Sequence, residues 1–125
     1  MITPLPPFAP ASAALPSTTV LAGGFVARIG ESRRRAGTLI AVVSRRAVAG
    51  RLIWRPAAPG ERWPGPDGRL LARLLAAAGV PAEWRRAWPL LEAGGTILWV
   101  PGVNVRPERG GRVVDEVDLE LEVPW

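Results

Sequence analysis

The stretch from Arg55 to Gly102 reads RPAAPGERWPGPDGRLLARLLAAAGVPAEWRRAWPLLEAGGTILWVPG, and it decides the fold. Prolines and glycines crowd its first third, which excludes a regular element there and predicts turns. A leucine-rich run and a short run between two prolines follow, and both have helical spacing. Two short apolar runs around a Gly-Gly pair close the stretch and predict a hairpin. The order turn, helix, helix, hairpin predicts a helical insertion within a β-rich chain.

The first predicted helix follows Asp67, which stands where a capping residue is expected. Its apolar positions lie on one helical face, and Gly79 supplies a stop; these positions are Leu70, Leu71, Leu74, Leu75 and Ala78. Arg69 and Arg73 fall on the opposite side.

A second, short helix is predicted to begin at Pro81 and to run through Trp88. Trp84 and Trp88 are four residues apart, so they share a face, while Arg85 and Arg86 point elsewhere. The tryptophans could form a stacking platform for unpaired bases. Core packing is the favoured interpretation, because so short a helix is stable only if it buries an aromatic stripe.

The N-terminal half contains three short apolar segments that predict an antiparallel meander. These are Val20–Ile29, Thr38–Val43 and Ala47–Trp54, and the intervening turns carry Arg33–Arg35 and Arg45–Arg46. The arginines of these turns are either solvated or in contact with RNA backbone.

Two hairpins are predicted towards the C-terminus. The first joins Leu90–Leu91 to Thr96–Val100, and the last joins Val103–Arg106 to Arg112–Val123. The final strand alternates valine and leucine with acidic residues, so it has one apolar and one acidic face. The acidic face could be solvated, pair with arginine from a neighbouring strand, or repel RNA.

These elements predict an α+β fold with mostly antiparallel sheets, about six or seven short strands, and a central two-helix insertion. We expect a single domain over residues 20–125. Residues 1–19 are uncharged and rich in proline, alanine and serine, which predicts a linker or disordered lead-in. A basic leader is missing and no apolar run approaches the ~20 residues that span a bilayer. A cytoplasmic location, without membrane contact, is therefore expected.

Composition narrows the function. The chain of 125 residues has no histidine, cysteine, tyrosine or lysine, which removes the commonest catalytic bases, nucleophiles and metal ligands. We expect no catalytic and no metal-binding residue. All 16 basic residues are arginine and the net charge is +5. Residues 1–112 hold all 16 arginines against 6 acids, so a polyanionic partner is favoured. A GC-rich genome could also enrich arginine.

Five pieces of sequence, in order, resemble the C-terminal domain of tRNA(Ile)-lysidine synthetase. They cover a little over a third of the chain, and they are Arg55 with Pro59-Gly60-Glu61-Arg62-Trp63, the leucine-rich helix ending in Gly79-Val80-Pro81, Arg85, Pro89-Leu90-Leu91, and Ile97-Leu98-Trp99-Val100-Pro101-Gly102. The family usually has a lysine-rich stretch before the helix, and here Arg69 and Arg73 partly replace it.

The resemblance implies a non-catalytic part of an ATP-dependent ligase. The family enzyme joins lysine to a cytidine in the anticodon of an isoleucine tRNA, and its catalytic domain carries a Ser-Gly-Gly-x-Asp-Ser loop for pyrophosphate. That loop is missing here, and the nearest run is Ala22-Gly23-Gly24-Phe25. We therefore expect no cofactor in this chain, with ATP belonging to a separate catalytic domain or chain. The sequence fits either the end of a longer synthetase or a separate protein built from that end.

The predicted function is tRNA binding that helps to orient tRNA(Ile) for lysidine formation by that catalytic domain. The predicted RNA-binding residues are Arg62, Arg69, Arg73, Arg85 and Arg86. Arg85 could bind phosphate, or it could hold the neighbouring loop through backbone carbonyls. The alternatives are a structural or protein-docking module, and an RNA-binding domain of another tRNA enzyme, because related domains occur in the phenylalanyl-tRNA synthetase β chain.

Overall fold

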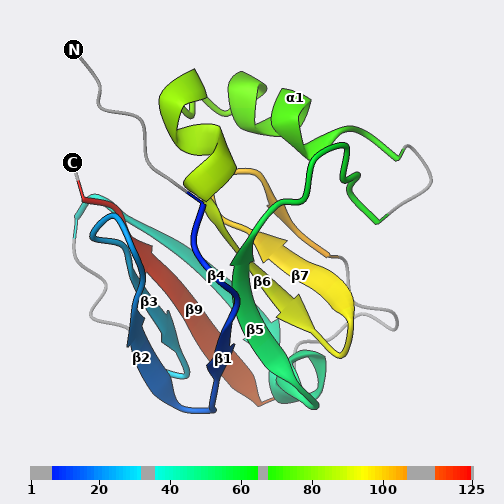
Figure 1. The fold of residues 1–125 in the computed structure, drawn as a ribbon. Helices are drawn as coiled ribbons and strands as arrows, with labels where there is room; N and C mark the ends of the chain where they lie inside the picture. The colour runs from blue at the N-terminus through cyan, green and yellow to red at the C-terminus, as the bar shows by residue number, and fades with distance from the viewer. Residues whose placement is uncertain (1–6, 32–35, 65–67, 107–114, 125) are drawn as a thin grey trace.

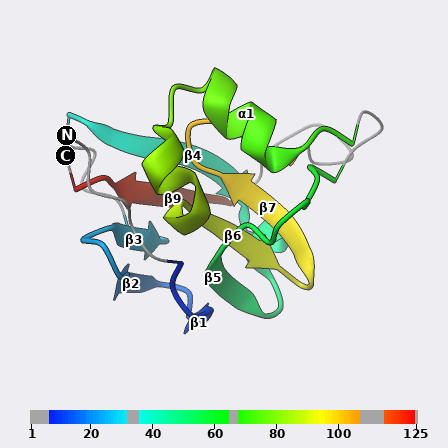
Figure 2. The same ribbon diagram turned by 45° about the horizontal axis from the view of Figure 1, so that its top comes forward.

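Two antiparallel sheets and a helical segment make up the fold (Figures 1 and 2). The computed structural model describes residues 7–31, 36–64, 68–106 and 115–124. The first sheet has the order β1-β5-β6-β7-β8, with bounds β1 (Ala11–Ala13), β5 (Leu52–Pro56), β6 (Pro89–Ala93), β7 (Thr96–Val100) and β8 (Asn104–Val105). The second has the order β2-β3-β9-β4, with bounds β2 (Ser17–Val20), β3 (Val26–Ile29), β9 (Glu116–Glu122) and β4 (Thr38–Ser44).

The predicted helical insertion is confirmed between β5 and β6. It consists of α1 (Leu71–Ala77) and the 3-10 helix η2 (Ala82–Ala87), and both lie at one end of the sheets (Figure 1). A second 3-10 helix, η1 (Arg45–Val48), lies at the opposite end (Figure 1). The α+β class is therefore confirmed, and the described residues form nine strands where six or seven were predicted.

One hydrophobic core joins the two sheets and the helical segment. Trp54 and Trp99 of the first sheet pack edge to face, with ring centroids 6.1 Å apart. Trp88, which directly follows η2, packs in the same geometry against Phe25, the residue just before β3 of the second sheet, with ring centroids 5.7 Å apart. Its indole nitrogen donates a hydrogen bond of 2.9 Å to the carbonyl of Pro101. Trp88 therefore fastens the helical segment to both sheets, as the core interpretation predicts.

Trp84 is less deeply placed than its partner. It is half-buried and packs against the edge of the core. The short helix η2, which contains Trp84 and ends just before Trp88, is a 3-10 helix, and the backbone N–H of Trp84 donates to the carbonyl of Pro81 three residues back. The two indoles differ in burial because the tighter winding of a 3-10 helix does not place residues four apart on one line.

Three sequence predictions about the strands are wrong. The boundary at residue 20 is wrong because β1 pairs with β5 and β2 pairs with β3, so residues 11–13 and 17–19 belong to the sheets. The meander is wrong because β9 lies between β3 and β4, and β5 belongs to the other sheet. The last hairpin is wrong because β8 pairs with β7 whereas β9 pairs with β3 and β4.

The start of α1 also differs from the prediction. The residue before the helix is Leu70, and its side chain makes no capping hydrogen bond. The predicted cap, Asp67, lies outside the described residues and three positions before Leu70. The predicted stop is confirmed, since Gly79 has φ of +85°, a conformation that glycine adopts without strain.

The acidic face of β9 is partly buried. Glu120 is fully buried and its carboxylate accepts a 2.9 Å hydrogen bond from Arg28 of β3, which also lies 2.8 Å from Glu122. Pairing with arginine from a neighbouring strand therefore describes this part of the face. These contacts join two strands that are far apart in the sequence, and they use the charge of Arg28 inside the fold.

Candidate nucleic-acid interface

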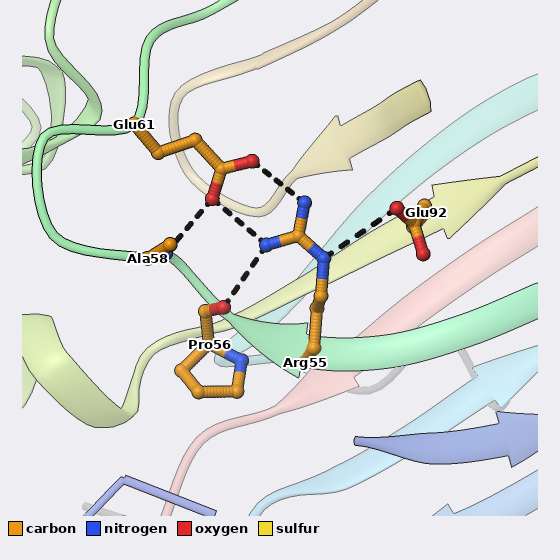
Figure 3. Close-up of polar contacts among 5 residues, drawn as sticks. All are labelled: Arg55, Pro56, Ala58, Glu61 and Glu92. Carbon is orange, nitrogen blue, oxygen red and sulfur yellow. Dashed lines mark hydrogen bonds and ion pairs between the residues drawn. The ribbon is translucent and has the colours of Figure 1, made fainter. Parts of the chain in front are cut away.

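The turn that leads from β5 towards α1 is built around Arg55 and Glu61 (Figure 3). The Arg55 guanidinium donates to both carboxylate oxygens of Glu61, at 2.8 and 2.6 Å, and to the carbonyl of Pro56 at 3.1 Å. Its Nε lies 3.7 Å from a carboxylate oxygen of Glu92 on β6. The side chains thus tie the turn to two strands of the first sheet.

The backbone of this turn matches its sequence. Glu61 N–H donates to the carbonyl of Ala58 at 3.0 Å, and Gly60 has φ of +76°. Proline at the second and glycine at the third position of a four-residue turn favour this conformation. The Ala58 N–H donates in return to the Glu61 carboxylate at 2.8 Å. Pro59-Gly60 therefore favours the backbone conformation of the turn, and the hydrogen bonds of Glu61 stabilise it.

Charge within this pair is neutralised. The hydrogen bonds from Arg55 hold the pKa of Glu61 below its usual value, against the opposing effect of burial. The same bonds with Glu61 raise the pKa of Arg55. Both side chains are about four-fifths buried. Arg55 is therefore a structural residue, and its charge adds little to the positive surface.

The turn then positions the residues that flank positions 65–67. Leu71 N–H donates to the carbonyl of Glu61 at 3.0 Å, and Trp63 N–H donates to the carbonyl of Arg69 at 2.8 Å. Arg62 is exposed, and its guanidinium donates to the carbonyl of Gly68 at 2.6 Å. Arg62 therefore stabilises the stem of this loop, with the rest of its guanidinium at the surface.

Two hollows lie beside α1. The first, which we call the Trp63 pocket, has a volume of about 280 Å³ and is lined by Trp63, Arg69, Leu74, Val103 and Asn104. The second, the Arg86 pocket, has a volume of about 450 Å³. It lies among η2, the Pro59-Gly60 turn and the apolar face of α1, and its lining is Pro7, Ala57, Ala58, Pro59, Gly60, Glu61, Leu70, Leu71, Ala72, Leu75, Arg85 and Arg86.

The predicted arginines divide between these places. Arg69 is exposed at the Trp63 pocket, and Arg85 and Arg86 meet at the other pocket. Arg73 is exposed on α1 and lines neither hollow, while Arg62 belongs to the loop stem. All five therefore lie on the helical segment or in the segment that leads into it, but at separate places and not in one patch.

Arg85 has one of the two roles that the sequence left open. It is half-buried, and its Nε donates to the carbonyl of Val80 at 2.9 Å. The hydrogen bond fixes the orientation of the guanidinium, and Arg85 is one of the residues that line the Arg86 pocket. The prediction that Arg85 holds the neighbouring loop is confirmed, and phosphate binding by the same side chain stays a prediction.

Sequence reasoning missed three contributors to this surface. Arg55 and Glu61 were placed in the turn without a role, although an arginine and a glutamate flanking Pro-Gly signal a pair that closes it. Asn104 carried no signal, because β8 brings it beside Arg69 from a distant part of the chain. The turn Arg33–Arg35 lies outside the described residues, and Arg45 forms a 2.8 Å ion pair with Asp115.

The Gly23-Gly24 turn joins β2 to β3, so it lacks the helix N-terminus that supports phosphate in a glycine-rich loop. No group of three or more metal-ligating side chains comes together within the described ranges. None of the helices described is both long and apolar enough to cross a bilayer.

Comparison with known proteins identifies the family. Residues 52–113 match a family model described as the TilS substrate C-terminal domain. The tRNA(Ile)-lysidine synthase of Symbiobacterium thermophilum is 42% identical over 77 residues, which cover 56% of this chain and 16% of that protein. The chain thus matches a small part of that curated relative.

A solved structure agrees. The crystal structure of a TILS C-terminal domain superposes with a TM-score of 0.62 and 26% sequence identity, and the match covers 87% of this chain and 92% of that one. Its extent shows that both sheets and the helical segment belong to one shared fold. The chain belongs to the family of tRNA(Ile)-lysidine synthetase C-terminal domains.

Proposed function

We propose that this domain binds tRNA through backbone phosphates and holds it for a separate ATP-dependent catalytic domain, which forms lysidine at the anticodon cytidine of tRNA(Ile). The observation that carries the proposal is the presence of Arg69, Arg73, Arg85 and Arg86 on or directly beside α1 and η2 in a domain of this family. Guanidinium groups suit phosphate because their planar fork can donate two parallel hydrogen bonds.

The arginines that are paired inside the fold differ from those assigned to RNA. Arg28 and Arg55 have their charges compensated by carboxylates within the fold. Positive charge in the helical segment is different, since α1 carries no acid and η2 carries Glu83 alone. Within the described residues, α1 and η2 together therefore present three arginines against one acid to an approaching phosphate backbone. The chain itself supplies no residue for adenylation or for lysine transfer in this proposal, and it acts in the cytoplasm where tRNA is modified.

The proposal is tested by titrating fluorescently labelled, unmodified tRNA(Ile) with the purified chain at low salt. We expect saturable binding, and weaker binding of the double variant Arg69→Glu/Arg73→Glu. Arg46→Glu serves as the control for charge reversal and is compared with Arg69→Glu and Arg73→Glu singly, because Arg46 is exposed on η1 at the opposite end of the fold (Figure 1).

Two outcomes would overturn the proposal. One is the absence of tRNA binding at low salt, and the other is an equal loss of affinity in the double variant and in the control. If the chain then still assembled with the catalytic domain, a protein-docking module would be the better account.

A further inference from the structure

We infer that the Trp63 pocket binds one unpaired nucleotide of the RNA, with the base against Trp63 and its phosphate at Arg69. The inference rests on the proposed function and deepens it, because it assigns a contact to a base beside the contacts to phosphates. The pocket was not among the sites predicted from the sequence, and its residues come from the entry loop, α1 and the segment after β7.

Trp63 has the placement of a stacking surface. Its indole is half-buried, with one part packed against the core and another part lining the pocket. The bond from its backbone N–H to the carbonyl of Arg69 holds the two residues side by side. Aromatic side chains fixed in this way stack on unpaired bases, and little ordering is needed on binding.

Asn104 gives the pocket a hydrogen-bonding edge. It is the single asparagine of the chain and it is exposed. Its side-chain oxygen accepts a 2.8 Å hydrogen bond from the backbone N–H of Val105. That bond assigns the oxygen, because an N–H can donate only to the oxygen of the amide. The amide nitrogen, with two donors, is the other end of the side chain and suits the acceptor atoms of a base edge.

The lining of the pocket decides between occupants. Trp63 offers a ring face and Asn104 an amide edge to one unpaired base, whereas the bases of a duplex have their faces covered by stacking and their pairing edges occupied. Arg69 at the rim supplies the charge that a nucleotide phosphate needs. The Arg86 pocket is larger, but no aromatic side chain is among its lining residues, so it lacks a stacking surface and fits backbone contact better.

The test compares labelled single-stranded oligonucleotides of uridine, cytidine and adenosine with a short RNA duplex, by fluorescence anisotropy. We expect Trp63→Leu to weaken single-strand binding by ~5- to 100-fold, the range for loss of one stacked base, and to leave duplex binding unchanged. Trp63→Phe should restore most of the affinity. Asn104→Ala should reduce the preference among the three oligonucleotides, and Arg46→Ala is the control for general charge.

Each outcome of these measurements supports or overturns the binding of an unpaired nucleotide at the Trp63 pocket. The inference is overturned if the folded Trp63→Leu variant binds single strands like the parent, if parent binding shows no advantage of single strands, or if only assembly with the catalytic domain is lost. Should Trp63→Leu fail to fold, Asn104→Ala answers alone, and an unchanged preference overturns the inference. Salt-sensitive tRNA binding without the single-strand effects refutes the pocket but keeps the proposed function. Single-strand effects without tRNA binding refute the proposed function alone.

Discussion

Arg55 and Glu61 neutralise each other, and their pairing stabilises the turn at Pro59-Gly60 that leads from β5 towards α1. Arg55 lies in β5, and Glu61 directly precedes Arg62, so the pair connects β5 with the segment that bears Trp63. Loss of the pair should therefore loosen the stem from which both the loop and α1 begin.

Glu61→Gln should lower the free energy of unfolding by about 1–3 kcal/mol at neutral pH, since it weakens two charge-assisted hydrogen bonds in a largely buried site. The folded-state pKa of Glu61 lies below its ordinary value. Its contribution is therefore present above the ordinary pKa of ~4.3 and is lost as the pH falls through the lowered one.

Denaturant unfolding at pH 7 and at pH 3 checks this prediction. The difference between parent and Glu61→Gln should shrink at the lower pH. Glu83→Gln, an exposed glutamate on η2, should leave stability nearly unchanged at both. A difference that stays constant with pH would contradict the assigned role of the Glu61 charge.

Trp88→Ala should cost ~3–5 kcal/mol of unfolding free energy, because it removes a buried indole, its contact with Phe25 and its hydrogen bond to Pro101. Trp84→Ala should cost clearly less, since Trp84 is only half-buried. Chemical denaturation of both variants gives the comparison. Equal costs, or a Trp88→Ala variant as stable as the parent, would show that the core is not organised around Trp88.

At the level of elements, the sequence predicted which segments form structure better than it predicted which segments pair. The hairpin of β6 and β7 was predicted because its partners are joined by a short turn. The placement of β9 between β3 and β4 could not be read from local spacing, because alternation marks a strand and does not name its neighbour. β1 was missed because three residues without charge or branched side chains carry no strand signal.

The candidate site shows the same division. Arg69, Arg73, Arg85 and Arg86 were found because they lie on or beside elements with clear helical spacing. The placement of Arg69 at one pocket and of Arg85 and Arg86 at the other depends on tertiary packing, and so does the approach of Asn104 to Trp63. Side chains that meet through distant strands leave no pattern in a single sequence.

Charge reversal on η2 tests the role of that element. Arg86→Glu should weaken tRNA binding roughly tenfold, because it removes one charge-assisted contact and adds repulsion. Arg46→Glu on η1 makes the same charge change at the opposite end of the fold and should have little effect (Figure 1). The measurement is the affinity of each variant for tRNA, from anisotropy titrations at one fixed salt concentration. Equal losses of affinity in Arg86→Glu and Arg46→Glu would contradict a localised interface.

At the scale of the whole molecule, the chain corresponds to a small part of its curated relative, so catalysis is expected to require another domain. Incubation of the purified chain with ATP, lysine and unmodified tRNA(Ile) should form no lysidine. Nucleoside analysis of the recovered tRNA is the measurement, and a complete synthetase is the positive control. Lysidine formed by the chain alone would contradict the division of labour that we propose.

The net charge of +5 has two possible meanings for the molecule, and salt dependence separates them. If Arg69, Arg73, Arg85 and Arg86 each neutralise a phosphate, four contacts release counterions. A plot of the logarithm of affinity against that of salt concentration should then have a slope of roughly −3 to −4. The slope should become shallower by about one unit when one of the four is replaced by alanine, and it should not change in Arg46→Ala. Phosphate contacts do not read sequence, so other tRNAs should give nearly the same slope. Affinity that is flat in salt would mean that the arginines reflect composition alone, and that the domain contacts protein.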